Sequence, residues 1–535
     1  MFFSRAGLTV LCLVFLLVFV PHTCRIAGKK KILIFPYTNV YNSRTMNLEK
    51  IAVMLKDHDF HVTMLVSHHY APKRNIDGVN LIRYKIPELQ MNKGGEFDLD
   101  RSLRYIEKDV IPLLRQVDEM DFAVCEHLLS SNGILDKLRD EKFDLLFFDF
   151  VNVCSGPIIY ESFGIPSIMY SNFGFMETWT LFKQPTFYSY TPGIYSSFSD
   201  NMTFWDRVQN TDMLLDLEKW ASDRIDHIER MKAKYLPNNN WPHAKHSFER
   251  VSLIIAANVN FALDYPRPVM PHVIPISGLL WTPAKPLPKE YENIVSAAPN
   301  GVILVSFGTL VPTFSIEKAE ILARVFSKLS QTVIWRYQGV PPKSVGNNTH
   351  LVEWLPQNDL LAHPNTKLFI THCGVSSTWE TLYHAVPVVA IPLLWDQHHH
   401  ARKLKERAKI SETVNFGTLN EEELESTILK VVSDKSYKEN AIKMSKLLQD
   451  TPMSGQEELL YWIKYVIRHN GTLHFHSHAA YGLNWYQYYL LDVISYKAAA
   501  SCLYYLTWLL PLVIVWKVFR FVFIRLKCLI AFLHP

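Results

Sequence analysis

The sequence predicts an α/β protein with two domains, each built on a parallel β-sheet. Short apolar runs rich in β-branched and aromatic residues alternate with longer helical segments over most of the chain. Such alternation is typical of parallel strands joined by right-handed crossovers. The chain has 535 residues, which exceeds the size of one ordinary domain. A proline-dense stretch near the middle of the chain, within residues 266–299, indicates an interdomain linker.

The first predicted domain, residues 28–265, begins with a short apolar run that is typical of a buried strand. The expected strands are 31–36, 61–67 and 143–150, and the expected helices are 46–56 and 99–139. Residues 172–240 are irregular and rich in Phe, Tyr and Trp. Helical packing around the sheet and an apolar acceptor pocket explain this composition equally well.

The second predicted domain, residues 300–470, repeats the alternation of strands and helices. The expected strands are 301–307, 332–337, 349–353, 367–371 and 387–392, and the expected helices lie within 421–468. Between the last two strands, Ser376, Ser377 and Thr378 mark a helix start, because Ser and Thr side chains cap the free backbone N–H groups at such positions.

This strand–turn–helix unit is predicted to bind a nucleotide diphosphate. Free N–H groups and the positive end of the helix dipole attract anions to such a turn. His372 and Gly374 lie in the turn, and an imidazole there can donate a hydrogen bond to a phosphate oxygen. Glu380 lies one helical turn further on, where a carboxylate can accept hydrogen bonds from a ribose diol.

The same stretch carries nine residues at fixed spacing over 44 positions. The pattern is W-x-P-Q, then H-x-G-x-x-S-x-x-E, then D-Q, and it is met by Trp354, Pro356, Gln357, His372, Gly374, Ser377, Glu380, Asp396 and Gln397. It resembles the signature of the UDP-dependent glycosyltransferases, the family of the UDP-glucuronosyltransferases. The resemblance covers nearly the whole chain and implies a GT-B fold, in which two Rossmann-like domains face each other. The second would bind the UDP-sugar and the first would bind the acceptor.

The resemblance also implies a role for each matched residue. Trp354 would stack on uracil, Gln357 would lie near the ribose, and Glu380 would bind the ribose hydroxyls. The diphosphate would be held by Ser306, Gly308, Thr309, His372, Gly374, Ser376 and Ser377. Asp396 and Gln397 would hydrogen-bond the transferred sugar, close to His400, where many family members carry Asn.

The acceptor side departs from the family pattern at the general base. Family members use a His after the first strand, oriented by an Asp after the fourth strand. Asp149 matches the Asp, although a cap for the next helix also explains a carboxylate there. The His position falls on Arg44 when counted back from the next strand and on Tyr41 when counted forward. Neither is a normal base near neutral pH. Three explanations are open. Another group acts as the general base, or Asp149 alone acts on a phenol or carboxylic acid. The third is that the chain binds ligands without transferring sugar.

No metal or other cofactor is expected, because the helix start and His372 are placed to stabilise the departing UDP. His398, His399 and His400 are consecutive, so on a helix they point about 100° apart and cannot chelate one ion together. They are predicted to form a solvated helix start. The net charge of +4 is small for this length and indicates no nucleic-acid partner.

The two ends of the chain predict a luminal protein anchored in the endoplasmic reticulum membrane. Residues 1–27 have the form of a signal peptide, and residues 498–516 form an uncharged run long enough to cross a bilayer. A juxtamembrane segment, 471–497, would precede this run. The basic tail, 517–535, would lie in the cytosol, which makes the protein type I. Glycosylation sequons occur at Asn201, Asn347 and Asn470.

The seven cysteines show no C-x-x-C spacing. Cys125, Cys154 and Cys373 lie in the body of the chain and are predicted to be free buried thiols, with one disulfide as the alternative. The sequence leaves open whether the protein is a homo-oligomer. The predicted function is inverting transfer of a hexose or glucuronic acid from a UDP-sugar to a hydroxyl or carboxyl of a small lipophilic acceptor. The alternative is a catalytically silent binding protein with the same fold.

Overall fold

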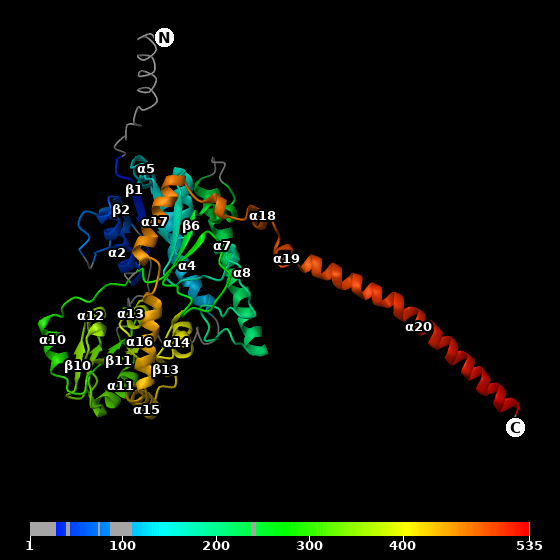
Figure 1. The fold of residues 1–535 in the computed structure, drawn as a ribbon. Helices are drawn as coiled ribbons and strands as arrows, with labels where there is room; N and C mark the ends of the chain where they lie inside the picture. The colour runs from blue at the N-terminus through cyan, green and yellow to red at the C-terminus, as the bar shows by residue number, and fades with distance from the viewer. Residues whose placement is uncertain are drawn as a thin grey trace, which may run out of the picture. The chain divides into compact units, whose positions relative to one another are not determined.

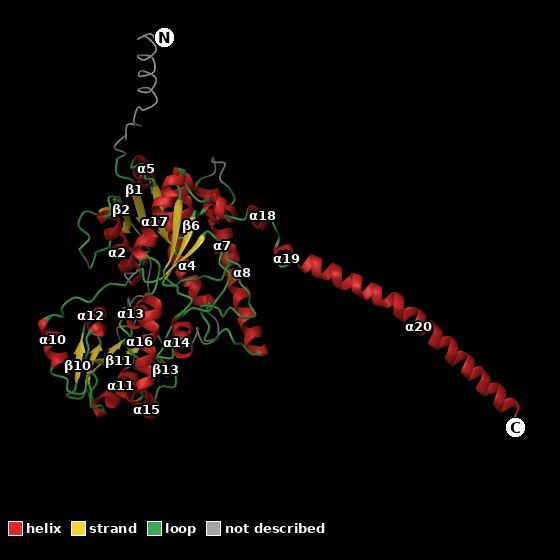
Figure 2. Ribbon diagram, in the orientation of Figure 1, coloured by secondary structure: helices red, strands yellow, loops and turns green. Residues whose placement is uncertain are grey.

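The computed structural model describes residues 28–38, 43–72, 75–85, 110–131, 133–236, 242–279, 281–309, 311 and 313–533. The chain divides into two compact units, residues 1–475 and 476–535. Both β-sheets belong to the first unit (Figures 1 and 2). The predicted signal peptide and Tyr41 lie outside the described residues.

The first sheet has seven parallel strands in the order β3-β2-β1-β4-β5-β6-β7. The strands are β1 Lys31–Phe35, β2 His61–Ser67, β3 Asn80–Tyr84, β4 Leu145–Asp149, β5 Ser167–Ser171, β6 Leu253–Ala257 and β7 Val273–Ile276. The strands predicted near residues 31, 61 and 143 are confirmed. Side chains alternate between the two faces of a strand, so Leu33 and Phe35 enter one core while Ile32 and Ile34 enter another.

Helices cover this sheet, and one of them corrects a prediction. They are α2 Ser43–Asp57, α4 Ile111–Ser130, α5 Ile134–Asp140, α6 Ser155–Phe163, α7 Trp179–Phe182, α8 Phe204–Tyr235 and α9 Ala244–Ser247. Residues 172–240 are not irregular throughout, because α8 is a 32-residue helix. A capping box between Thr203 and Asp206 begins it, which is the signal in the sequence that could have revealed it.

The second sheet has six parallel strands in the order β10-β9-β8-β11-β12-β13. They are β8 Val302–Ser306, β9 Thr332–Arg336, β10 Thr349–Val352, β11 Thr366–Thr371, β12 Val388–Ala390 and β13 Ser411–Thr413. The accompanying helices are α10 Lys289–Ser296, α11 Ile316–Lys328, α12 Gln357–Ala362, α13 Val375–Tyr383, α14 Gln397–Glu406, α15 Glu421–Ser433 and α16 Lys435–Gln449. All five strands predicted for this half are present, and β13 is an additional one.

Two segments join the halves in ways that the sequence did not indicate. Residues 266–299, predicted as a linker, contain β7 of the first sheet and α10. Helix α17, Gly455–His469, follows α16 but packs on the first sheet (Figure 1). Its Leu459, Ile463 and Val466 are buried in the core that contains Ile32 and Ile34. The chain therefore returns to its first sheet after completing the second.

The second unit consists of helices. They are α18 His478–Tyr481, α19 Trp485–Tyr488 and α20 Leu491–Leu533, and α20 contains the predicted membrane span at 498–516. Across the part of the chain that the structure describes, no helix has both the length and the apolar character needed to cross a membrane. The structure therefore does not confirm the predicted span.

Candidate functional site

The turn between β11 and α13 is built closely around the His372 ring. Gly374 is the N-cap of α13, and Gly308 lies early in the loop after β8 with a φ of +79°. A Cβ at Gly308 would lie 2.5 Å from His372 Nε2, and a Cβ at Gly374 would lie 2.6 Å from the same atom. Both positions therefore require glycine, because any side chain would collide with the imidazole. The predicted residues of the β8 and β11 loops are thus brought together around one ring.

His372 is a neutral group in this environment. Burial lowers its pKa to about 4, while Asp396 acts in the opposite direction. A neutral imidazole carries one N–H donor. His372 can therefore donate to an anion without first taking up a proton.

The first turn of α13 provides an anion site with an unused hydroxyl. It contains no acidic residue, so the positive helix end is not neutralised by its own side chains. The buried Oγ of Ser376 has no hydrogen-bond partner among the described residues. Buried hydroxyls are nearly always paired, so this one fits an oxygen of a bound ligand.

One amide links three of the predicted site residues. Gln357 Nε2, at the start of α12, donates to Ser377 Oγ over 3.1 Å and to Glu380 Oε2 over 2.7 Å. These residues are 20 and 23 positions apart in the chain. The amide holds the Glu380 carboxylate beside the start of α13, where a ribose next to a diphosphate would lie.

An arginine that the sequence analysis missed lies beside the Trp354 ring. The indole of Trp354 is 47% exposed, and the Arg336 guanidinium carbon lies 5.6 Å from its ring centroid. Arg336 also donates from Nη1 to the carbonyl oxygen of Gly308. The available signal was a lone cation that ends β9 directly after three apolar residues, 333–335. The indole offers an open flat face for a base, and Arg336 adds positive charge between that face and the glycine loop.

Asp396 and Gln397 begin α14 and have different internal partners. Gln397 Oε1 accepts from the backbone N–H groups of Leu393 and Leu394, each over 2.8 Å, so it holds the loop before the helix. Asp396 Oδ2 lies 2.9 Å from His400 Nε2. Both Asp396 and Gln397 are buried.

The prediction of a solvated histidine segment at the start of α14 is wrong. His399 and His400 are 4% and 2% exposed. The His399 ring packs edge-on against Tyr265, with 5.8 Å between the centroids, and His400 is held by Asp396. Burial lowers the pKa of both rings. Tertiary packing buries these two side chains, and a run of polar residues in the sequence does not predict such burial.

On the first sheet, Asp149 is bound by Arg44. Asp149 ends β4 and is fully buried. Arg44, from the start of α2, donates from Nη2 to Oδ1 and from Nε to Oδ2, the latter over 3.2 Å. The rings of Tyr37, Phe150 and Phe173 lie within 4.9 to 5.8 Å of its guanidinium carbon. The arginine therefore occupies an aromatic cage and is matched to a carboxylate at two points.

The remaining contacts of Asp149 bear on the alternatives left by the sequence. The N-cap of the next helix, α6, is Cys154, so Asp149 does not cap it. Asp149 Oδ1 instead accepts from the Val151 N–H over 2.9 Å. Within the described part of the chain, no histidine hydrogen-bonds Asp149. The carboxylate is engaged by a guanidinium and a backbone amide.

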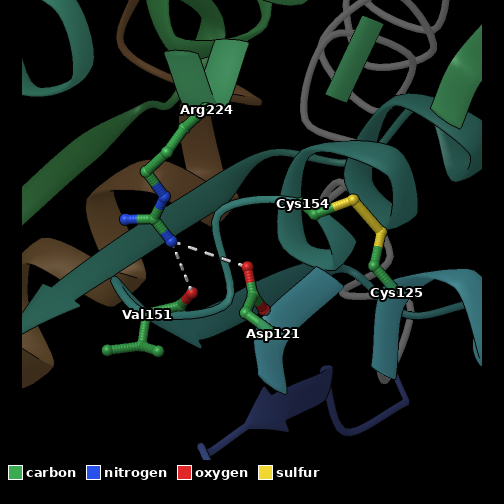
Figure 3. Close-up of a disulfide and its surroundings, with 5 residues drawn as sticks. All are labelled: Asp121, Cys125, Val151, Cys154 and Arg224. Atoms are coloured by element: carbon green, nitrogen blue, oxygen red, sulfur yellow. Dashed lines mark hydrogen bonds and ion pairs between the residues drawn. A yellow bond between two sulfur atoms is a disulfide. The ribbon is translucent and has the colours of Figure 1, made fainter. Parts of the chain in front are cut away.

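A disulfide holds the loop that follows Asp149, which corrects the prediction of free thiols for two cysteines. Cys125 of α4 is bonded to Cys154, with 5.9 Å between their Cα atoms, whereas Cys373 is a free buried thiol. Arg224 of α8 lies beside this bridge (Figure 3) and donates from Nη2 to the Val151 carbonyl oxygen over 3.4 Å. Two links therefore tie the loop after Asp149 to neighbouring helices.

Two buried carboxylates face Arg224. Its Nε lies 3.0 Å from Asp118 Oδ1, and its Nη2 lies 3.6 Å from Asp121 Oδ2. Burial raises the pKa of Asp121 to about 7, partly offset by the charge of Arg224. The sequence did not indicate this cluster of Arg224, Asp118 and Asp121, because its members are spread over about a hundred positions of the chain.

Comparisons with known proteins show which family the chain resembles. Residues 30–527 match the family model described as UDP-glucoronosyl and UDP-glucosyl transferase. Human UDP-glucuronosyltransferase 1A8 is 35% identical over 382 residues, which is 71% of this chain and 71% of that protein. Human UDP-glucuronosyltransferase 2B10 is 34% identical over 424 residues, or 76% of this chain and 79% of that protein.

Solved structures show the same fold at low sequence identity. The glycosyltransferase of kitacinnamycin superposes with a TM-score of 0.56 at 16% identity, covering 82% of this chain and 99% of its own. A UDP-glucosyltransferase from Polygonum tinctorium superposes with a TM-score of 0.54 at 16% identity, covering 83% and 99%. Together with the two parallel sheets, these matches establish a GT-B fold. The chain therefore belongs to the UDP-glucoronosyl and UDP-glucosyl transferase family and is a UDP-dependent glycosyltransferase.

Proposed function

We propose that the enzyme transfers a hexose or glucuronic acid from its UDP-sugar to an acidic hydroxyl or carboxyl group of a small lipophilic acceptor, with inversion at the anomeric carbon. The observation that carries the proposal is the geometry around α13. A neutral imidazole, an unused buried hydroxyl and an oriented carboxylate lie in the order that phosphate and ribose require.

On the donor side, each part of the nucleotide has a group of suitable chemistry. The exposed indole face of Trp354 would stack on uracil, and Glu380 would bind the ribose diol. The first turn of α13, with His372 and Ser376, would bind the diphosphate. Asp396 would accept a hydrogen bond from the transferred sugar.

Departure of UDP places negative charge on the diphosphate, and protein groups are available to stabilise it. The fold holds the start of α13 and the His372 N–H in place beside the proposed diphosphate site. These groups therefore do not have to reorganise while the sugar is transferred. Arg336 adds a positive charge beside the glycine loop. We therefore propose that transfer needs no metal ion, and a chelator should leave turnover unchanged.

On the acceptor side, the Arg44–Asp149 pair determines which nucleophiles are suitable. The two oxygens of the Asp149 carboxylate are already engaged by the Arg44 guanidinium, so neither is free to approach an acceptor hydroxyl. The same guanidinium favours a negatively charged nucleophile nearby. Phenols and carboxylic acids lose their protons readily and depend least on a general base. The rings of Tyr37, Phe150 and Phe173 give this site the apolar character that a lipophilic acceptor requires.

The alternative function is binding of a UDP-sugar or a lipophile without transfer. It is favoured by the same pair, since no histidine hydrogen-bonds Asp149 among the described residues. Under this alternative Arg44 stabilises the domain and does not act on a substrate. The donor site would be as complete as in a transferase.

The deciding experiment follows UDP release from detergent-solubilised full-length protein with UDP-glucuronic acid, UDP-glucose and UDP-N-acetylglucosamine. The acceptors are phenols of graded acidity, a benzoic acid and a non-acidic alcohol of matched size. We expect acceptor-dependent release with one donor and a rate that increases with acceptor acidity. Saturable UDP binding with no release from any donor–acceptor pair would favour the silent binder. Equal rates with phenols and alcohols would reveal a separate base.

We also propose that the body of the protein lies in the lumen of the endoplasmic reticulum. The disulfide supports an oxidising compartment. The three sequon asparagines, Asn201, Asn347 and Asn470, are all exposed, as glycan attachment requires. A mobility shift on removal of N-glycans, together with resistance of the membrane-bound protein to alkaline extraction, would test the location and the proposed C-terminal anchor at 498–516.

A further inference from the structure

Tyr195 comes from the aromatic segment whose role the sequence left open, and its position is fixed by α8. The fully buried Asn210 of α8 donates to the carbonyl oxygens of Tyr188 and Thr191, each over 2.9 Å, and accepts from the Gly193 N–H over 2.9 Å. The N–H and the hydroxyl of Ser196 both donate to the Gly193 carbonyl oxygen. Tyr195 lies within this closed turn, so its backbone has little freedom.

The ring that Tyr195 meets belongs to the residue directly before Asp396. The centroids of Tyr195 and Trp395 are 6.4 Å apart and their planes are inclined by 58°. Trp395 has a left-handed backbone with a φ of 58°, which is uncommon for a bulky residue. It packs against the hydrophobic cores of both halves of the unit. The backbone turn thus places the indole against the first domain while Asp396 begins α14.

Charged groups of the donor side and of the acceptor side both act on the Tyr195 phenol. Asp396, Glu177, Arg44 and Arg224 all lie close enough to act electrostatically on it. Asp396 belongs to the predicted sugar-binding pair, and Arg44 is bound to Asp149 at the acceptor side. Tyr195 and Trp395 are both partly exposed, and both pack at the edge of the hydrophobic core of the first domain.

We propose that Tyr195 completes the binding site for the transferred sugar, donating a hydrogen bond from its hydroxyl to a sugar oxygen across from Asp396. This proposal rests on the proposed function, because it assumes that the UDP-sugar binds with its sugar next to Asp396. It makes Tyr195 a specificity-determining residue contributed by the first domain to a substrate bound mainly by the second. Sugar binding would then require both domains, whereas binding of UDP would require only the second.

The chemistry of the two groups is complementary. Burial, followed by the negative charges of Asp396 and Glu177, raises the pKa of Tyr195. The phenol therefore keeps its proton and acts as a donor, while the Asp396 carboxylate acts as an acceptor. A sugar hydroxyl can satisfy both, since it donates and accepts, and a uronic carboxylate can accept from the phenol.

The test compares affinities for a UDP-sugar and for UDP alone. Tyr195→Phe removes the hydroxyl and keeps the ring against Trp395, and calorimetry on the full chain in detergent, without acceptor, gives both affinities. The probes are the UDP-sugar that the wild-type protein binds best, and UDP. We expect the variant to bind the UDP-sugar about 5- to 10-fold more weakly, as loss of one hydrogen bond predicts, and to bind UDP normally.

Tyr190→Phe is the matched control. Tyr190 is exposed in the same segment and stacks on Phe187, with 5.6 Å between the ring centroids. The control should bind both ligands as the wild type does. Unchanged affinity of Tyr195→Phe for the UDP-sugar would overturn the proposal, and so would an equal loss for UDP, which would place the effect outside the sugar site. Because the assay measures binding, it stays decisive even if the protein proves unable to transfer sugar.

Discussion

Arg44 and Asp149, which are 105 positions apart in the chain, form a two-point ion pair at the carboxyl ends of the adjacent strands β1 and β4. The pair brings a permanent cation to the position where the family resemblance implies a histidine base. Asp149 is fully buried and the Arg44 side chain is 12% exposed, so the pair is only slightly screened by solvent. Substitutions at the two positions separate the effect of the pair on chemistry from its effect on stability.

Arg44→His should extend the acceptor range to non-acidic alcohols. A neutral imidazole beside Asp149 can take the proton that the guanidinium cannot, and a positioned general base contributes about 100-fold or more in rate. The measurement is turnover with the matched alcohol and phenol. Arg44→Gln is the control, because it removes the charge without supplying a base. Equal alcohol turnover by the His and Gln variants would contradict the prediction.

Asp149→Asn should abolish turnover while leaving UDP affinity unchanged, because Asp149 lies on the acceptor side. It should also lower the free energy of unfolding by about 3–5 kcal/mol, the usual result when one member of a buried ion pair is removed. The double change Arg44→Gln/Asp149→Asn should regain much of that stability without regaining activity. Denaturant unfolding and turnover measure the two effects. A single variant that remains active would exclude Asp149 from the reaction.

Glu380→Ala should weaken UDP binding by about tenfold, because it removes the carboxylate that Gln357 orients toward the proposed ribose position. Calorimetric titration with UDP measures the change. Glu422→Ala alters an exposed glutamate on α15 and should have no effect on UDP affinity. If both variants bind UDP equally well, the ribose does not lie at Glu380.

Loss of the disulfide should destabilise the first domain. The bridge between Cys125 and Cys154 closes a loop with a sequence separation of 29, and replacing both residues by Ser should lower the free energy of unfolding by about 2–4 kcal/mol. The same change should reduce turnover more than UDP affinity, because the bridge adjoins the Asp149 loop. Cys502→Ser removes an exposed free thiol and serves as the control. An unaltered unfolding midpoint after the double replacement would show that the bridge does not form.

The stability that buried neutral histidines contribute should be lost as the pH is lowered from about 6.5 toward 4. Burial lowers the pKa of His372 and of His384 to about 4, from an ordinary 6.5. At these two histidines the unfolded chain binds more protons than the folded chain in this pH range, so their contribution to stability is complete above pH 6.5 and is lost on acidification. The buried Asp121 carboxyl, whose pKa is raised to about 7, acts in the opposite direction. Each ring accounts for about 1–3 kcal/mol.

The measurement is the thermal midpoint as a function of pH. His384→Gln keeps a donor for Asn358 Oδ1, which lies 2.9 Å from His384 Nε2, and it should flatten the pH profile. A variant with the same acid sensitivity as the wild type would show that His384 does not contribute.

The sequence by itself determined the features that depend on neighbours close along the chain. Apolar runs predicted the central strands of both sheets, because strand burial follows from the local pattern. The strand–turn–helix unit at 366–383 was also predictable, since its turn, its helix start and Glu380 fall within a few residues of one another. The spacing of the signature from Trp354 to Gln397 indicated the family, which the comparisons confirm.

Only the tertiary structure decided which distant residues meet. The Arg44–Asp149 pair, the Cys125–Cys154 bridge and the contact of Tyr195 with Trp395 depend on strand order and on the paths of long connections. Burial of His399 and His400, and the return of α17 to the first sheet, depend on packing between elements far apart in the chain. Local patterns carry no information about such packing, because the energy of a contact depends on what the rest of the fold places beside a side chain.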